Sequence, residues 1–337
     1  MLLDIVLIII GVAMVLYGAD RLTEGASALA RRMNVSEIII GLTIVAAGTS
    51  APELFVSMAS ALKGTPDLAV GNVVGSNTMN CMLIVGCAAM VAPMTISRST
   101  VKKDMPFSVG ASVLLMLLAL NSFLGRVDGI ILLLGFAAFM AYTLRQAKTD
   151  KAEDHGDGSD DPISGGNGIT QNRPHDPGGN GITQNRPHDP VWKNVLFLLG
   201  GLLLLAVGSN VFVGHASSLA LSLGVSEGVV GLTVVAGGTS LPELATSVVA
   251  ARKGQSAIAI GNVIGSNVFN ILLILGLTAT ISPLEITGIT TIDMAVMLLS
   301  VALVWLFSFT RFTVERWEGA VLVGGYLVYL GWLITSL

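Results

Sequence analysis

Long apolar runs follow one another along almost the whole chain and are separated by short polar segments. A run of about 20 apolar residues crosses the ~30 Å hydrocarbon layer of a bilayer as one helix. Ten runs approach this length: residues 3–20, 38–62, 68–93, 106–122, 127–145, 194–213, 228–251, 257–282, 291–309 and 318–336. The pattern predicts an all-α membrane protein with ten transmembrane helices.

The composition agrees with a membrane protein. Of the 337 residues, 53% are hydrophobic and 12% are charged, about half the charged share of an ordinary soluble domain. The first run begins at Leu2 without a basic leader, and no clear small-residue cleavage site precedes Arg21. We therefore expect it to be a retained helix and not a signal peptide.

The two halves of the chain repeat each other at an offset of 190 residues. Segment 41–57, GLTIVAAGTSAPELFVS, matches 231–247, GLTVVAGGTSLPELATS, at 12 of 17 positions, and 71–77, GNVVGSN, matches 261–267, GNVIGSN. Each copy holds five predicted spans, and an odd number of spans inverts the second copy in the membrane. The sequence predicts two inverted five-helix repeats, 1–148 and 191–337, with broken helices at an ion site.

Residues 149–190 form a hydrophilic linker between the repeats, which contains GGNGITQNRPHDP twice, at 165–177 and 178–190. Its Gly, Pro and Asn content predicts a disordered segment. A regulatory metal site built from His175, Asp176, His188 and Asp189 is the less favoured interpretation.

Basic residues indicate the orientation of the chain. With the N-terminus outside, 16 of the 18 Lys and Arg residues fall on the cytoplasmic side, and only Lys63 and Arg126 lie outside. Basic loops are retained in the cytoplasm. We therefore predict an integral protein of the bacterial inner membrane with both termini outside (periplasmic) and the linker cytoplasmic.

Two glutamates lie deep inside apolar runs. Glu53 and Glu243 occupy equivalent repeat positions, and no basic residue shares their depth. An ionised carboxylate at that depth costs several kcal/mol unless it faces a polar cavity or a partner. A protonated acid that only packs helices is the alternative, and it is less suited to a symmetric pair.

Each glutamate directly follows a proline, within GTSAPE (48–53) and GTSLPE (238–243). Proline donates no N–H and crowds the carbonyl four residues earlier, so we expect a break that frees carbonyls around Ala46–Thr49 and Ala236–Thr239. Hydroxyl groups three and four residues before each glutamate lie on the same helix face. A kink without function is the alternative at either proline alone.

The next span of each half carries a polar stripe with a period of four. It comprises Asn72, Ser76 and Asn80 in the first half and Asn262, Ser266 and Asn270 in the second. Gly71 and Gly75, like Gly261 and Gly265, allow close backbone approach. Hydrogen bonding between helices is an alternative role for the stripe. Asn77 and Asn267 lie off it and are interpreted as structural.

Carboxylate, hydroxyl, amide and carbonyl oxygens without sulfur or imidazole suit Ca²⁺ and Na⁺ better than zinc or copper. Cys81 and Cys87 lie too far apart along one predicted helix for a disulfide. No phosphate-binding loop, nucleophile triad or nucleic-acid surface is evident. We predict a transporter that is not an enzyme, needs no cofactor and does not bind nucleic acid.

At these motifs the chain resembles the calcium/cation antiporter superfamily, specifically the sodium/calcium exchanger family of the bacterial inner-membrane type. The resemblance implies that Glu53 and Glu243 are the principal Ca²⁺ ligands, together with the carbonyls of Thr49 and Thr239. It also implies flanking Na⁺ positions, lined by Ser50, Ser240, Ser76, Ser266, Asn80, Asn270 and the carbonyls of Ala46 and Ala236. Some members carry aspartate where this chain has Asn80 or Asn270.

The resulting hypothesis is antiport of Ca²⁺ against Na⁺ by alternating access, because two buried negative charges must be balanced before they reorient. A Ca²⁺/H⁺ or K⁺-dependent exchanger would use the same residues with another counter-ion. A passive cation channel and a membrane scaffold without transport are the remaining alternatives.

Overall fold

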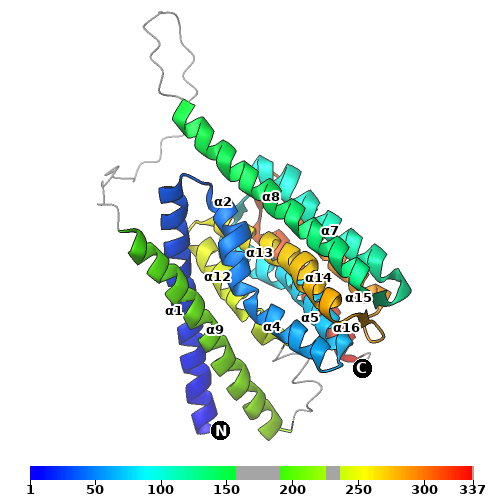
Figure 1. Cartoon of the computed structure of the whole chain (residues 1–337). Helices are drawn as coiled ribbons and strands as arrows, with labels where there is room; N and C mark the ends of the chain where they lie inside the picture. The colour runs from blue at the N-terminus through cyan, green and yellow to red at the C-terminus, as the bar shows by residue number, and fades with distance from the viewer. Residues whose placement is uncertain (157–189, 225–235, 336–337) are drawn as a thin grey trace, which may run out of the picture.

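The computed structural model describes residues 1–156, 190–224 and 236–335 (Figure 1). The first half contains α1 (Leu2–Met33), α2 (Glu37–Ile40), the π-helix η1 (Gly41–Val45), α3 (Ala46–Thr49), α4 (Ala51–Leu62), α5 (Pro66–Met79), the π-helix η2 (Asn80–Ile84), α6 (Val85–Val91), β1 (Met94–Thr95), the π-helix η3 (Thr100–Asp104), α7 (Met105–Leu118), the 3₁₀ helix η4 (Ala119–Asn121), β2 (Phe123–Leu124) and α8 (Arg126–Gly156). The second half contains α9 (Val191–Ser222), α11 (Ala236–Thr239), α12 (Leu241–Arg252), α13 (Ser256–Val268), the π-helix η6 (Phe269–Leu275), α14 (Gly276–Ile281), β3 (Leu284–Glu285), α15 (Thr291–Ser308), β4 (Thr313–Val314) and α16 (Arg316–Thr335).

The described residues hold eight helices that are long and apolar enough to cross a membrane, and a bent pair, Glu37–Thr49 with Ala51–Leu62, makes a ninth. These coincide with nine of the ten predicted runs. The remaining run, 228–251, is described only from residue 236, as α11 and α12. The helical membrane architecture is confirmed, whereas the count of ten and the inverted arrangement stay predictions.

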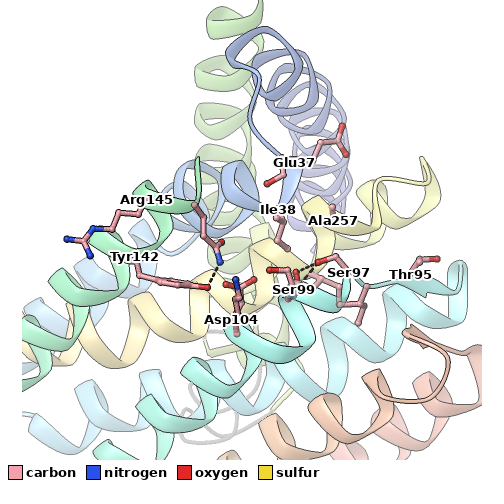
Figure 2. Close-up of a pocket in the computed structure, with 15 residues that line it drawn as sticks. Glu37, Ile38, Thr95, Ser97, Ser99, Asp104, Tyr142, Arg145 and Ala257 are labelled. Carbon is pink, nitrogen blue, oxygen red and sulfur yellow. Dashed lines mark hydrogen bonds between the residues drawn. The ribbon is translucent and has the colours of Figure 1, made fainter. Parts of the chain in front are cut away.

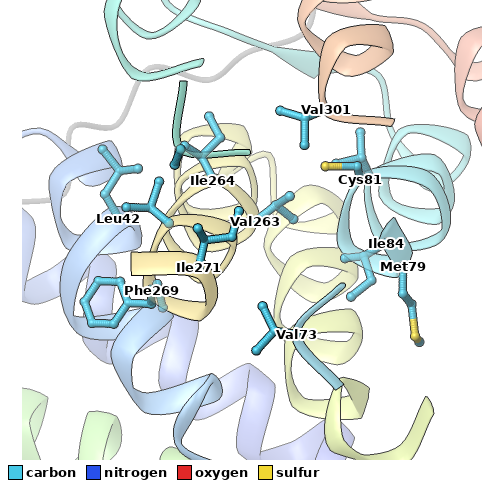
Figure 3. Packing of buried hydrophobic residues seen from close by; sticks show 14 of the residues in the cluster. Leu42, Val73, Met79, Cys81, Ile84, Val263, Ile264, Phe269, Ile271 and Val301 are labelled. Carbon is cyan, nitrogen blue, oxygen red and sulfur yellow. The ribbon is translucent and has the colours of Figure 1, made fainter. Parts of the chain in front are cut away.

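Two spans form the interior of the bundle. In the span Ser256–Ile281, 94% of the residues in an apolar stretch of 18 are buried within the protein, and in Pro66–Val91 the share is 78%. In the spans of α1, α8, α9 and α16 the share is only 17–28%. Side chains of these two spans interlock in the core, among them Val73, Ile84, Val263 and Ile271 (Figure 3). The spans with the polar stripes are therefore those most shielded from lipid.

Helices α1 and α9 lie side by side at the edge of the bundle (Figure 1). Gly11, Gly18 and Gly25 of α1 recur every seven residues and meet the α9 backbone, and Gly201 and Gly208 of α9 meet α1 in the same way. A Cβ at Gly201 would lie 2.6 Å from the backbone nitrogen of Leu22. Glycine removes this obstacle, so the two helices pack backbone to backbone.

The expectation of a purely α-helical fold is corrected, because the described residues include four strands of two residues each. Strand β1 pairs antiparallel with β4, and β2 with β3, so each ladder joins the two halves. Pro93 and Pro283 stand directly before β1 and β3. A proline forces the preceding residue towards extended backbone, and Ala92 and Ser282 adopt it. The polar backbone of each connection is then paired across the repeat boundary.

The start of the linker is also corrected. Helix α8 does not end near residue 148 but continues to Gly156. Residues 147–155, AKTDKAEDH, are rich in Ala, Lys and Glu, which have high helix propensity, so the helix propagates beyond the apolar run. Most of the predicted linker, including both copies of GGNGITQNRPHDP and the His-Asp pairs, lies outside the described residues.

Candidate cation-binding site

Each half contains a helix break beside its buried glutamate. The breaks lie at Ser50, with φ −83° and ψ 5°, and at Ser240, with φ −89° and ψ 6°. Helices α4 and α12 begin at the next residue and carry proline as their second residue and Glu53 or Glu243 as their third. The first break bends the chain by 45°. The predicted breaks at the two Pro-Glu sequences are confirmed.

The carbonyls at the breaks are only partly freed, which corrects the sequence prediction at Ala46. The Ser50 N–H still donates to the Ala46 carbonyl over 2.9 Å. Proline removes the backbone donor expected by Gly48, four residues before it. In the second half the equivalent carbonyl, that of Gly238, accepts a hydrogen bond of 2.5 Å from the Ser209 hydroxyl. Ala236 is described as the first residue of α11.

The two breaks contact each other reciprocally. The Ser50 hydroxyl donates to Glu243 Oε1 over 3.2 Å, and the Ser240 hydroxyl donates to Glu53 Oε1 over 3.1 Å. The Ser76 hydroxyl lies 3.1 Å from the Ser240 hydroxyl, within hydrogen-bond distance. Both glutamates are 0% exposed. The tertiary structure thus brings the two Pro-Glu sequences, 190 residues apart, into one buried cluster.

Several buried oxygens around this cluster have no hydrogen-bond donor. They are Glu53 Oε2, Glu243 Oε2, Asn80 Oδ1, Asn270 Oδ1 and the Ser266 hydroxyl. No ion pair in the described part of the chain includes either glutamate. A buried carboxylate without a compensating charge is costly. This arrangement of unpaired acceptor oxygens suits a hard cation.

The first residue of each polar stripe binds the helix that carries the glutamate. Asn72 Nδ2 donates to the Glu53 carbonyl over 3.2 Å and to the Ser57 hydroxyl over 2.9 Å. Asn262 does the same with the Glu243 carbonyl, over 3.4 Å, and with Ser247, over 3.0 Å. These amides fix the helices that carry the glutamates. Hydrogen bonding between helices therefore accounts for the first residue of each stripe.

The Thr49 hydroxyl joins the two halves near Asn262, whose Oδ1 lies 3.0 Å away. Thr49 also contacts the Val45 carbonyl within its own helix, over 3.1 Å. Thr239, its repeat equivalent, is 9% exposed and is the last residue of α11, directly before the second break. Both threonines therefore stand where the backbone leaves the helix.

Asn80 and Asn270 are held by residues that the sequence placed off the stripe. Asn80 Nδ2 donates to Asn267 Oδ1, and Asn270 Nδ2 donates to Asn77 Oδ1, each over 3.0 Å. Asn77 Nδ2 in turn donates to the Asn267 carbonyl over 3.2 Å. These bonds turn the Asn80 and Asn270 amide nitrogens away and leave their carbonyl oxygens unpaired. Asn77 and Asn267 are therefore structural, as predicted, and they also position two candidate ligands.

Asn80 begins η2 and Asn270 lies in η6, so both stripes end in a π-helical turn. A π-turn inserts an extra residue into a helix and is common at functional sites. Beyond such a turn, residues four apart in the sequence no longer lie on the same face of the helix. Apart from the recurrence of Asn in both repeats, no sequence pattern predicts these turns.

Glycine brings the second stripe close to the first break. A Cβ at Gly261 would lie 2.8 Å from the Ile38 carbonyl, and one at Gly265 would lie 2.7 Å from that of Leu42. The predicted close approach is confirmed for this pair. Among the described residues, a Cβ at Gly71 would lie 3.0 Å from the Ile289 side chain and not against a backbone.

Comparisons with known proteins agree with this geometry. The model of the family described as sodium/calcium exchanger protein matches residues 3–145 and 193–335. The putative antiporter CaxA of Alkalimonas amylolytica is 34% identical over 340 residues, which cover 100% of both chains. Inner membrane protein YrbG of Escherichia coli K12 is 37% identical over 339 residues, 99% of this chain and 97% of that one.

Two further matches come from proteins described as exchangers. The sodium/calcium exchanger MaX1 of Methanosarcina acetivorans is 32% identical over 351 residues, 97% of each chain. The structure of the sodium-calcium exchanger NCX_Mj soaked with zero Na⁺ and Ca²⁺ superposes with a TM-score of 0.80 at 27% identity, covering 98% of this chain and 99% of that one. The chain is therefore a transmembrane antiporter of the sodium/calcium exchanger family.

Proposed function

We propose that the chain exchanges Ca²⁺ for Na⁺ across a bacterial inner membrane by alternating access. The carrying observation is the pair of fully buried glutamates, each with one carboxylate oxygen that has no hydrogen-bond partner. The names of MaX1 and NCX_Mj support the choice of ions, and that of YrbG supports the choice of membrane. No resident cofactor is part of the proposal.

Charge balance explains why such a site would exchange ions instead of leaking them. Two ionised glutamates are neutralised by one Ca²⁺ or by Na⁺ ions. Empty, the same site holds about two uncompensated charges in a medium of low dielectric, and reorientation in that state is disfavoured. Cargo must then be bound in both directions of the cycle, which is antiport.

The ligand roles follow from which oxygens remain available. Glu53 and Glu243 hold Ca²⁺ through their unpaired oxygens, together with the carbonyls of Thr49 and Thr239. The unpaired oxygens of Asn80, Asn270 and Ser266 support flanking Na⁺ positions. These positions are completed by Ser50, Ser240, Ser76 and the carbonyls of Ala46 and Ala236. The hydroxyls of Ser50 and Ser240, which donate to the carboxylates, still have lone pairs that a bound cation can use.

We further propose ten transmembrane helices arranged as two inverted five-helix repeats. Reciprocal contacts support this arrangement: Ser50 bonds Glu243 as Ser240 bonds Glu53. The strand pairs β1–β4 and β2–β3 are related by the same 190-residue offset. A two-fold axis produces such pairs of contacts: if one residue contacts a second, the repeat equivalents of both residues also contact each other.

The counter-ion is tested by ion-driven uptake into proteoliposomes. Vesicles that contain the purified chain are loaded with Na⁺, with K⁺ or with an acidic buffer, and ⁴⁵Ca²⁺ uptake is followed after dilution into choline medium at neutral pH. We expect Na⁺-loaded vesicles to take up Ca²⁺ and the other two to match empty liposomes. A carboxylate pair that closes only around a bound cation requires this coupling.

Uptake driven by the acidic interior alone would contradict Na⁺ coupling and favour Ca²⁺/H⁺ exchange. Uptake that requires Na⁺ and K⁺ together would indicate a K⁺-dependent exchanger. Ca²⁺ currents of channel size in planar bilayers, with no need for a counter-ion, would contradict antiport itself.

The orientation is tested by labelling single cysteines in intact cells. Lys63 follows α4 and Lys102 lies in η3; both side chains are exposed, and the proposed topology puts them on opposite sides. With Cys81 and Cys87 replaced by alanine, a membrane-impermeant maleimide should label Lys63→Cys and not Lys102→Cys. Permeabilised cells, in which both variants react, provide the control. The opposite pattern would reverse the proposed topology.

A further inference from the structure

A cavity of about 620 Å³ lies at one end of the bundle, outside the candidate site just described. It is enclosed by the start of α2, the loop after β1, η3, the last turns of the α8 span and the start of α13 (Figure 2). Hydroxyl groups of Ser97, Ser99, Thr100 and Tyr142 line it. None of its lining residues belongs to the glutamate cluster. A polar cavity of this size is large enough for water and a solvated ion.

The cavity contains an unsatisfied carboxylate. Asp104, the last residue of η3, is 2% exposed, and its Oδ1 has no hydrogen-bond partner. Among the residues that the structure describes, it takes part in no ion pair. Figure 2 shows Asp104 between Tyr142 and Ser99, with the Arg145 side chain directed away from it. A buried carboxylate in this state requires compensation.

The other charged groups at the cavity do not provide it. Glu37 is acidic, and its Oε1 already accepts a hydrogen bond of 2.5 Å from the Ser27 hydroxyl. Lys103, the neighbour of Asp104 in the chain, is exposed to solvent. Tyr142 accepts a hydrogen bond from Gln146, which leaves its O–H free to turn. Lys103 and Arg145 also line the cavity, but in the part of the chain that the structure describes neither forms an ion pair with Asp104.

The repeat explains why this cavity is open. At the other end of the bundle, Asp67 accepts hydrogen bonds from the Thr287 N–H (2.7 Å), the Thr287 hydroxyl (2.6 Å) and the Gly288 N–H (2.8 Å). That carboxylate fastens the loop after β3. At the offset of 190, the position of Asp67 is taken by Ala257, which lines the cavity. A methyl group cannot fasten the equivalent loop, so the space beside it remains.

The position of the buried carboxylate also differs between the two repeats. The repeat equivalent of Asp104 is Met294, a buried apolar residue, and at that end Asp67 is fully bonded by its loop. At the end that holds Asp67, the acid is satisfied by hydrogen bonds. At the end that holds Ala257, a cavity lies beside an acid with an unpaired oxygen.

We propose that Asp104 and the hydroxyls around it form a second cation-binding site, selective for a monovalent alkali cation such as Na⁺. Hard oxygen ligands suit Na⁺ and K⁺ as they do Ca²⁺. One available carboxylate balances a single positive charge, whereas a divalent ion would leave the cavity with excess charge. The ion braces α2 and α13 against α7 and α8, next to the helices that carry the glutamate cluster.

The site is tested on the full chain with the glutamate cluster disabled. Purified protein carrying Glu53→Gln and Glu243→Gln is titrated with ²²Na⁺, with N-methyl-D-glucamine holding the ionic strength constant. Saturable binding of one Na⁺ per chain should remain and should be lost when Asp104→Asn is added. Asp67→Asn, at the already bonded acid, should leave the binding unchanged. Excess Ca²⁺ should compete no better than K⁺.

A second variant keeps the carboxylate and fills the space. Ala257→Leu adds bulk to the cavity wall on a helix where leucine is well tolerated, and it should also abolish the remaining binding. Thermal unfolding of each variant verifies that the protein is folded. Absence of saturable Na⁺ binding in the doubly substituted parent, or binding that survives both Asp104→Asn and Ala257→Leu, would overturn the proposal. Preferential displacement by Ca²⁺ would overturn its monovalent assignment. Na⁺-driven Ca²⁺ uptake by the unmodified chain is a separate measurement, so the two proposals can fail independently.

Discussion

Replacing either buried glutamate by glutamine is expected to abolish Ca²⁺ transport. Glutamine retains the shape and one carbonyl oxygen of Glu53 or Glu243 but removes the negative charge that a bound Ca²⁺ neutralises. Loss of one charge from a buried pair costs about 3 kcal/mol or more, which lowers affinity on the order of 100-fold. The two single variants should behave alike, because each carboxylate has the same reciprocal serine contact. Isothermal titration with Ca²⁺ and ⁴⁵Ca²⁺ uptake measure the two effects.

Glu318→Gln is the matched control. Glu318 is also a buried glutamate in the first turn of a helix with one unpaired oxygen, but its other oxygen accepts the Glu315 N–H at the start of α16. We expect its Ca²⁺ affinity and transport to match those of the unmodified protein. Undiminished uptake by the Glu53→Gln and Glu243→Gln proteins would remove the basis for a glutamate-centred site.

The second large effect is expected at the glycine contact between α1 and α9. In Gly201→Leu the new Cβ meets the Leu22 nitrogen at 2.6 Å and the Gly18 carbonyl at 2.7 Å, and both are backbone atoms that cannot turn aside. The helices must separate and lose their packing, at a cost of about 3 kcal/mol. We expect a lower thermal unfolding temperature and less monodisperse protein after purification in detergent.

The adjacent residue offers the control for this prediction. At Gly200 an added Cβ meets no described residue within 4 Å. Gly200→Leu makes the same change in composition, hydrophobicity and helix propensity, and it should unfold at the temperature of the unmodified chain or slightly above it. Equal behaviour of the two variants would show that close backbone approach does not stabilise the α1–α9 pair.

The apolar runs and the repeat predicted most of the fold because a bilayer restricts the possibilities. Backbone groups in lipid must bond within their own segment, so a run of suitable length and composition is a helix. The elements that escaped prediction lie where that restriction ends. Strands β1 and β3 lie in the connections after α6 and α14, and β2 and β4 lie in those after η4 and α15. Helix α8 continues beyond its apolar run because residues with high helix propensity extend past the hydrophobic ones.

The candidate site was predictable as a set of residues but not as an arrangement. Glu53, Glu243 and the serines beside the breaks were identified because polar groups in apolar runs are costly and here recur in both halves. The roles of Asn77 and Asn267 were not predictable in full, because η2 and η6 change the helical register in which Asn80 and Asn270 lie. Asp104 was not identified, because it stands at the end of an apolar run, where a carboxylate in sequence terms is ordinary.

The sequence by itself determined the environment of the chain, its helical spans and the positions of the helix breaks, since these follow from local hydrophobicity and from the missing N–H of proline. The matching segments of the two halves showed the duplication directly. Only the tertiary structure decided which oxygens remain unpaired. Whether a polar group is hydrogen-bonded depends on which partner lies close to it in space. Here the partners come from the other half of the chain: Ser240 for Glu53, Ser50 for Glu243 and Asn267 for Asn80. The sequence shows Asp67 replaced by Ala257 at the equivalent repeat position, but only the tertiary structure shows that one fastens a loop and the other lines a cavity.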